Sequence, residues 1–106
     1  MFSINPKPTF AAEVAISVAG GGTEKLQLVF KHKTRDEVKA FFAQAGAGAD
    51  DQSDADVLLE IVAGWEDVDV PFSREALDQL VQNYPSAPRA IFDAYLAELT
   101  GQRRGN

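Results

Sequence analysis

A glycine triplet, Gly20-Gly21-Gly22, separates two stretches of the chain in which apolar and polar residues alternate. Every second residue from Phe10 to Val18 is apolar, and the same holds from Leu26 to Phe30. An apolar period of two is typical of a strand with one buried face, and glycine readily adopts the positive φ values of a reversal. The sequence therefore predicts a β-hairpin over residues 9–32. Because a lone hairpin is marginally stable in water, its apolar face must pack against later elements.

Those later elements are predicted to be helices within residues 34–101. Thr34 and Glu37 form the pattern of a capping box, and Ser53, Ser73 and Ser86 are suitable N-caps for three further helices. Apolar residues follow each cap at helical spacing, which predicts one core-facing stripe for each helix. The expected core-facing residues are Val38, Phe41, Phe42, Ala45, Val57, Leu58, Ile61, Val62, Leu77, Leu80, Val81, Tyr84, Ile91, Phe92, Tyr95, Leu96 and Leu99.

Glycine and proline mark the expected ends of these helices. Gly46 to Ala49 is predicted to be a loop, Gly64 to end the second helix, and residues 65–72 to form an irregular connector. Pro85 ends the third helix, and residues 102–106 are expected to be a frayed tail. The predicted fold class is α+β: an N-terminal β-hairpin followed by about four α-helices in a single domain, residues 1–106.

The composition narrows the classes of partner. The formal net charge is −6, and residues 40–102 carry twelve acidic side chains against two arginines. An acidic body repels phosphate backbones, so nucleic acid is not an expected partner. No apolar run approaches the roughly 18 residues that cross a bilayer, and no secretory signal pattern is present, so no membrane partner is expected. Without cysteines there are no disulfides, and the reducing cytoplasm is the expected location.

The residues that usually carry catalysis are sparse. His32 is the only histidine, and it lies between two lysines with no nucleophile near it in the sequence, so a surface or edge-strand role is expected. A calcium loop starting at Asp50 would need glycine in its sixth position and glutamate in its twelfth, where Ala55 and Ile61 stand. We therefore predict that the protein is not an enzyme and uses no metal or cofactor.

Two large aromatic residues, Trp65 and Phe72, stand in the predicted connector. Aromatic side chains serve both in cores and as anchors in protein interfaces. The sequence favours the first role, in which both residues pin the connector to the core. It leaves open the second role, in which they are exposed to a partner.

The segment from Gly64 to Leu77 contains Gly-Trp, a short acidic stretch with a valine, and Pro-Phe-Ser before a leucine-bearing helix. Together with Leu80 to Pro85 and Ala90 to Tyr95, it resembles the tail assembly chaperones of long-tailed bacteriophages and prophages. The resemblance covers roughly residues 57–106, and the hairpin-first layout is also similar to some members.

The resemblance implies a non-catalytic chaperone that keeps the tape-measure protein soluble before tail-tube subunits polymerise around it. The expected partners are the tape-measure protein and the tail-tube protein, in the cytoplasm of the host cell. Several members form homo-oligomers, and in many a ribosomal frameshift gives a longer second product. The residues expected to contact partners, or to support the contact surface, are Trp65, Val68, Pro71, Phe72, Tyr84 and Tyr95.

A second hypothesis is a small bacterial adaptor or regulatory domain that binds a partner strand along its hairpin edge. Proline in place of Leu28 or Val29 is then expected to abolish binding, whereas binding through a helix face would survive any change that leaves the fold intact. The residues alone leave both hypotheses open.

Overall fold

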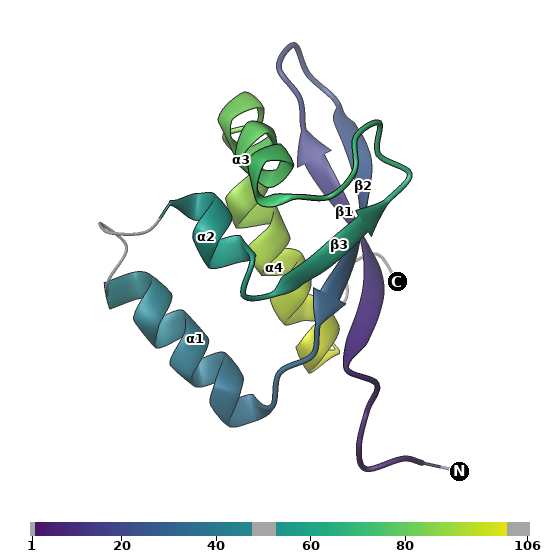
Figure 1. Ribbon diagram of the computed structural model, residues 1–106, viewed down its shortest axis with the longest axis vertical. Helices are drawn as coiled ribbons and strands as arrows, with labels where there is room; N and C mark the ends of the chain where they lie inside the picture. Colours follow the sequence, from purple (N-terminus) through teal and green to yellow (C-terminus); the bar gives the residue numbers. More distant parts are fainter. Residues whose placement is uncertain (1, 48–52, 102–106) are drawn as a thin grey trace.

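A three-stranded antiparallel sheet and four helices make up the α+β fold of the computed structural model, which describes residues 2–47 and 53–101 (Figure 1). The strands lie side by side in the order β1-β2-β3. The elements are β1 (Thr9–Ser17), β2 (Thr23–Lys31), α1 (Arg35–Ala47), α2 (Asp54–Leu58), β3 (Val62–Glu66), α3 (Arg74–Asn83) and α4 (Ala87–Thr100). The predicted fold class is confirmed, and a third strand is added to the predicted hairpin.

The hairpin forms where the alternation predicted it. β1 and β2 pair antiparallel along their whole length, and the three glycines between them have φ values from 86° to 101°. Residues with a side chain rarely adopt such values, so glycine is what allows the chain to reverse here. Ala12, Val14 and Ile16 are buried while the residues between them are exposed, which gives the sheet one core face.

The third strand corrects the prediction for residues 57–66. We expected a helix that ran through Val62 and ended at Gly64. Instead α2 ends at Leu58, and Val62–Glu66 forms β3, which pairs antiparallel with β2. The strand is favoured because β2 would otherwise leave its outer N–H and C=O groups unpaired, and because the β-branched Ile61 and Val62 suit a pleated surface. Residues 34–101 are therefore not purely helical.

The pairing of β3 places β2 in the centre of the sheet. The N–H of Lys31 also donates to the carbonyl of Ile61 across 2.7 Å, which extends this pairing by one bond. Leu28 and Val29, which the adaptor hypothesis placed at a binding edge, have strand neighbours on both sides. That placement was wrong, because the outer edge of the hairpin is β1.

The predicted caps hold three of the four helices. Thr34 and Glu37 form both bonds of the capping box, at 2.8 and 3.2 Å, and the bond from the Thr34 N–H lowers the pKa of the Glu37 carboxyl. The hydroxyls of Ser53 and Ser73 each accept a bond from the N–H three residues later. Ser86 stands at the N-cap of α4 but makes no capping bond, and its hydroxyl instead donates to the carbonyl of Ser17 at 3.4 Å.

The end of α1, like that of α2, differs from the prediction. α1 continues through Gly46 to Ala47, where we expected a loop to begin, and the rest of that predicted loop, residues 48–49, lies outside the described residues. Asp50, where the tested calcium loop would begin, and the predicted tail, residues 102–106, also lie outside them.

α4 packs across the core face of the sheet (Figure 1). Its Tyr95 ring lies close to those of Phe10 and Phe30, with centroids 6.1 and 5.1 Å away. Full burial of such a side chain stabilises the fold by roughly 1.5–3 kcal/mol. A helix therefore covers the apolar face of the hairpin, as we expected because a hairpin by itself is only marginally stable in water.

The other helices attach at the sides of this core. Phe41 and Phe42 of α1 meet Phe92 of α4 with ring centroids 5.9 and 5.8 Å away. α2 and α3 are joined by an ion pair in which Arg74 Nε lies 2.7 Å from Asp56 Oδ1. The bond from Arg74 lowers the pKa of the Asp56 carboxyl.

Within residues 2–47 and 53–101, no helix is both long and apolar enough to cross a membrane. The same part of the chain holds no group of three or more histidine, cysteine or acidic side chains placed to bind a metal ion.

Candidate functional site

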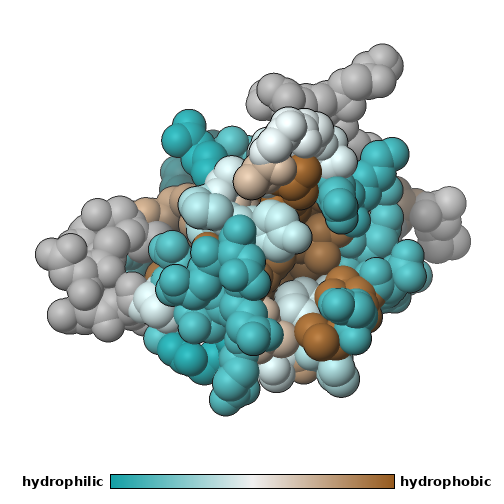
Figure 2. All heavy atoms as spheres, turned by 90° about the horizontal axis from the view of Figure 1, so that it is seen from above, coloured by the Kyte–Doolittle hydropathy of each residue, from teal (hydrophilic) through white to brown (hydrophobic). Residues whose placement is uncertain are grey.

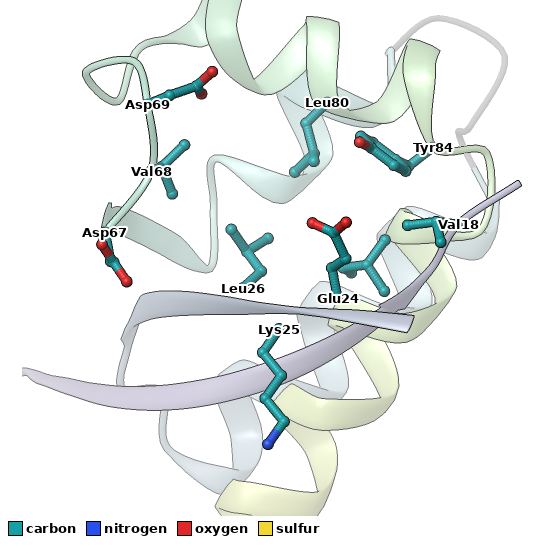
Figure 3. Close-up of a pocket in the computed structure, with 10 residues that line it drawn as sticks. Val18, Glu24, Lys25, Leu26, Asp67, Val68, Asp69, Leu80 and Tyr84 are labelled. Carbon is teal, nitrogen blue, oxygen red and sulfur yellow. The ribbon is translucent and has the colours of Figure 1, made fainter. Parts of the chain in front are cut away.

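A cleft of about 350 Å³ opens between the hairpin turn, the segment that follows β3 and the end of α3. In Figure 3 the side chains of Leu26, Val68 and Leu80 point toward one another across it. Seen from above, this end of the molecule has hydrophobic atoms in the middle, bordered by hydrophilic ones (Figure 2). The lining residues are Ile16, Val18, Glu24, Lys25, Leu26, Asp67, Val68, Asp69, Leu80 and Tyr84.

The wall next to β3 depends on an unusual backbone conformation. Asp67 directly follows β3 and has a φ of 59°, in the left-handed region that aspartate tolerates better than most residues with a side chain. This conformation turns the chain out of the strand. The half-buried Val68 is thereby directed into the cleft (Figure 3).

The charge around the cleft is negative. Glu24, Asp67 and Asp69 are exposed at its rim. The one lysine of the lining, Lys25, points away from the cleft in Figure 3, and its Nζ lies 3.7 Å from a carboxylate oxygen of Glu13. Apolar side chains beside carboxylates suit a protein segment that carries an apolar anchor next to lysine or arginine.

Trp65 and Phe72 lie together beside this cleft and do not line it. Their rings meet edge to face with centroids 5.0 Å apart, and both side chains are half-buried against the core. The Nε1–H of Trp65 donates to the carbonyl of Val70 across 2.9 Å. These contacts support the first of the two roles that the sequence allowed, in which the aromatic pair pins the segment after β3 to the core.

The remaining predicted site residues fall into three places. Val68 and Tyr84 line the cleft together, and Pro71 is exposed on the segment between β3 and α3. Tyr95 is fully buried, and its hydroxyl donates to the carbonyl of Lys31. A partner of the folded protein cannot touch it, so the expected contact through Tyr95 was wrong. Contact through Val68, Pro71 and Tyr84 stays a prediction.

A family model described as phage tail assembly chaperone matches residues 1–106. This chain belongs to the phage tail assembly chaperone family. The match also covers the hairpin and α1, whereas the residues that carried the resemblance all lie after α1. No curated protein and no solved structure matches the chain.

Of the residues that line the cleft of this tail assembly chaperone family member, only Val68 and Tyr84 were predicted from the sequence as site residues. Glu24 and Leu26 come from the hairpin and Leu80 from α3, and nothing in their local patterns separates them from ordinary strand and helix positions. Their proximity depends on β3, since this strand brings residues 67–69 beside β2. The one local signal was the β-branched pair Ile61 and Val62 before Trp65, which favours a strand, although so short an apolar run also fits a helix.

Proposed function

We propose that this member of the phage tail assembly chaperone family is non-catalytic and binds the tape-measure protein in the cleft beside β3. The observation that carries the proposal is a cleft on a chain of this family that combines apolar side chains, among them Leu26, Val68 and Leu80, with the carboxylates of Glu24, Asp67 and Asp69. The bound client stays soluble until tail-tube subunits assemble around it in the cytoplasm of the host cell.

The shape of the cleft supports a helical client. A helix presents apolar side chains at i, i+3, i+4 and i+7, and it binds by placing such anchors in an apolar depression. The cleft, at about 350 Å³, has room for an anchor side chain, and its walls are the half-buried Leu26, Val68, Leu80 and Tyr84.

The acidic rim supports a client segment with basic residues near its apolar anchor. Opposite charges speed the encounter of two proteins and disfavour partners of the wrong sign. Such rim contacts weaken with salt, since exposed charges are screened over about 8–10 Å at physiological ionic strength. Binding of this kind is reversible, as a chaperone that leaves the finished tail requires.

The proposal is tested by co-expressing the chain with the tape-measure protein of the same phage and measuring how much of that protein stays soluble and co-purifies. Val68→Asp places a carboxylate in the apolar wall and is expected to reduce co-purification by about tenfold or more. Val70→Asp is the matched control, because Val70 is 40% exposed, lies two residues further on and does not line the cleft.

Retention of the client by the Val68→Asp variant, at the level of the Val70→Asp control, would place binding elsewhere on the protein. A wild-type chain that neither binds the tape-measure protein nor raises its solubility would contradict the proposed function itself. Circular dichroism of both variants shows whether the fold is kept.

A further inference from the structure

The outer edge of β1 offers backbone hydrogen-bonding groups. The bonds from the Val18 N–H to the Gly22 carbonyl and from the His32 N–H to the Pro8 carbonyl set the pairing pattern. They show that the backbone N–H and C=O groups of the even-numbered residues of β1 point toward β2. The N–H and C=O groups of the odd-numbered residues therefore point away from the sheet. Of these, the carbonyl of Ser17 accepts the bond from Ser86. No hydrogen bond occupies the outward groups of Thr9, Ala11, Glu13 and Ala15 within the described part of the chain.

A groove runs along this edge between β1 and α4, with a volume of about 800 Å³. Its helix side carries Ala90, Ala94 and Ala97, and its strand side runs from Glu13 to Ser17. Alanine has no side-chain atoms beyond Cβ, so this helix face leaves room beside the strand. An extended segment added to β1 would pair with the free edge and place alternate side chains against the alanines.

The chain carries a segment of matching character in residues 2–8, here called the arm. Phe2 is 90% exposed and Ile4 is 86% exposed, the two highest values among the large apolar side chains of the described residues. In Figure 1 the arm leaves the start of β1 and runs away from the sheet. Two apolar side chains at alternate positions suit one face of a strand, and both gain by leaving water.

We propose that the groove between β1 and α4 binds the arm of a second copy of this chain, which adds to the free edge of β1 as a strand. The inference does not rest on the proposed function. Phe2 and Ile4 of the second copy then lie against the alanines of α4. Each copy carries both an arm and a groove, so the assembly closes as a reciprocal pair or a ring.

The arm of the same copy cannot occupy this groove. A reversal immediately before β1 would bring Phe2 no further along the strand than about Glu13, whereas the groove extends to Ser17. Pro6 and Pro8 also oppose a tight reversal, because proline fixes φ near −65° and keeps the preceding residue extended. The occupant must come from another molecule.

Charge favours the arm as the occupant over a direct pairing of two β1 edges. Three carboxylates, those of Glu13, Asp93 and Glu98, line the groove and leave it net negative, although Lys25 Nζ lies 3.7 Å from Glu13 Oε1 and Arg89 Nε lies 3.5 Å from Asp93 Oδ2. The arm carries Lys7 and no acidic residue. Two β1–α4 edges brought face to face would instead oppose like charges.

The test is sedimentation equilibrium of the full chain at concentrations up to about 1 mM, the weak end of specific association. We expect the wild type to self-associate, and Phe2→Ser with Ile4→Ser to weaken association by about tenfold or more. Val70→Ser is the matched control, since it removes an exposed apolar side chain outside both the arm and the groove.

The groove is tested separately. Ala15→Pro removes one outward N–H without removing a bond to β2, and proline is tolerated at sheet edges, whereas Ala15→Val keeps the N–H. We expect the proline variant to be monomeric and the valine variant to associate like the wild type. Ala97→Lys, which fills the groove with a good helix former, is a second groove variant in case Ala15→Pro disturbs the fold.

A complementation experiment decides between the arm and other modes of association. The arm variant retains a groove and the groove variant retains an arm, so an equimolar mixture is expected to form a one-to-one complex at a concentration at which each variant alone is monomeric. A monomeric wild type, an arm variant that associates like the wild type, or no complex in the mixture would each overturn the proposal. None of these outcomes depends on the tape-measure protein.

Discussion

The hydroxyl of Tyr95 donates a 2.7 Å hydrogen bond to the backbone carbonyl of Lys31 and thereby ties α4 to the last residue of β2. The tyrosine ring is fully buried, with the rings of Phe10 and Phe30 beside it. A buried hydroxyl needs a partner, and the carbonyl at the end of the strand supplies it. This contact joins the helix to the sheet, and with the buried ring it places Tyr95 in the core.

Tyr95→Phe is expected to lower the free energy of unfolding by about 1–2 kcal/mol, because it removes the hydrogen bond and leaves the ring in place. Urea denaturation followed by circular dichroism measures the change. Tyr84→Phe is the control, since the Tyr84 hydroxyl makes no hydrogen bond with any other described residue, and its effect is expected to be near zero. Equal effects of the two substitutions would show that the bond to Lys31 contributes no stability.

Stability at alkaline pH is expected to report on the same residue. Burial, followed by the nearby charge of Glu37, raises the pKa of Tyr95 from 10.0 to about 12. The folded protein therefore holds this proton more tightly than the unfolded chain. The stability that the protonated Tyr95 hydroxyl gives to the folded protein is complete below pH 10 and is lost as the pH rises toward 12. The melting temperature should fall across this window, and it should fall less in Tyr95→Phe than in the wild type. The same slope in both proteins would contradict the role of Tyr95.

The serine caps of α3 and α4 are expected to differ in their effect on stability. The Ser73 hydroxyl accepts a 3.0 Å bond from the N–H of Ala76, so Ser73→Ala should cost about 1 kcal/mol. Ser86 makes no capping bond, and Ser86→Ala should cost only a few tenths of that amount. Thermal denaturation of both variants provides the comparison. A larger loss for Ser86→Ala would mean that its contact with Ser17 stabilises the fold more than a cap does.

Gly64→Ala is expected to stabilise the protein by about 0.5–1 kcal/mol, because glycine within a strand loses more conformational freedom on folding than alanine. Gly64 lies in β3 opposite Val29, and a Cβ added there meets no atom within 4 Å. Gly21→Ala is the contrasting substitution: the space around it is also open, but its φ of 101° strains a side chain. Chemical denaturation should show a gain for the first variant and a loss for the second. A loss at both positions would show that β3 needs glycine for another reason.

The sequence by itself determined the elements whose signals are local. Alternation and three glycines predicted the hairpin, and the hydroxyl caps at Thr34, Ser53 and Ser73 marked three helix starts that the structure shows. These signals depend on residues no more than four positions apart, so no tertiary contact is needed to interpret them. The segment that begins at Gly64 resembled the tail assembly chaperones, and the family model that matches residues 1–106 describes the same family.

Only the tertiary structure decided the strand state of residues 62–66, the burial of Tyr95 and the cleft. A short apolar run such as Ile61-Val62 fits either a helix or a strand, and the unpaired groups of β2 resolved the choice. The cleft exists because β3 then carries Val68 to a position beside Leu26, which is distant in the sequence. Pairing between distant strands depends on backbone groups that every residue shares, and for this reason it leaves little trace in the amino-acid pattern.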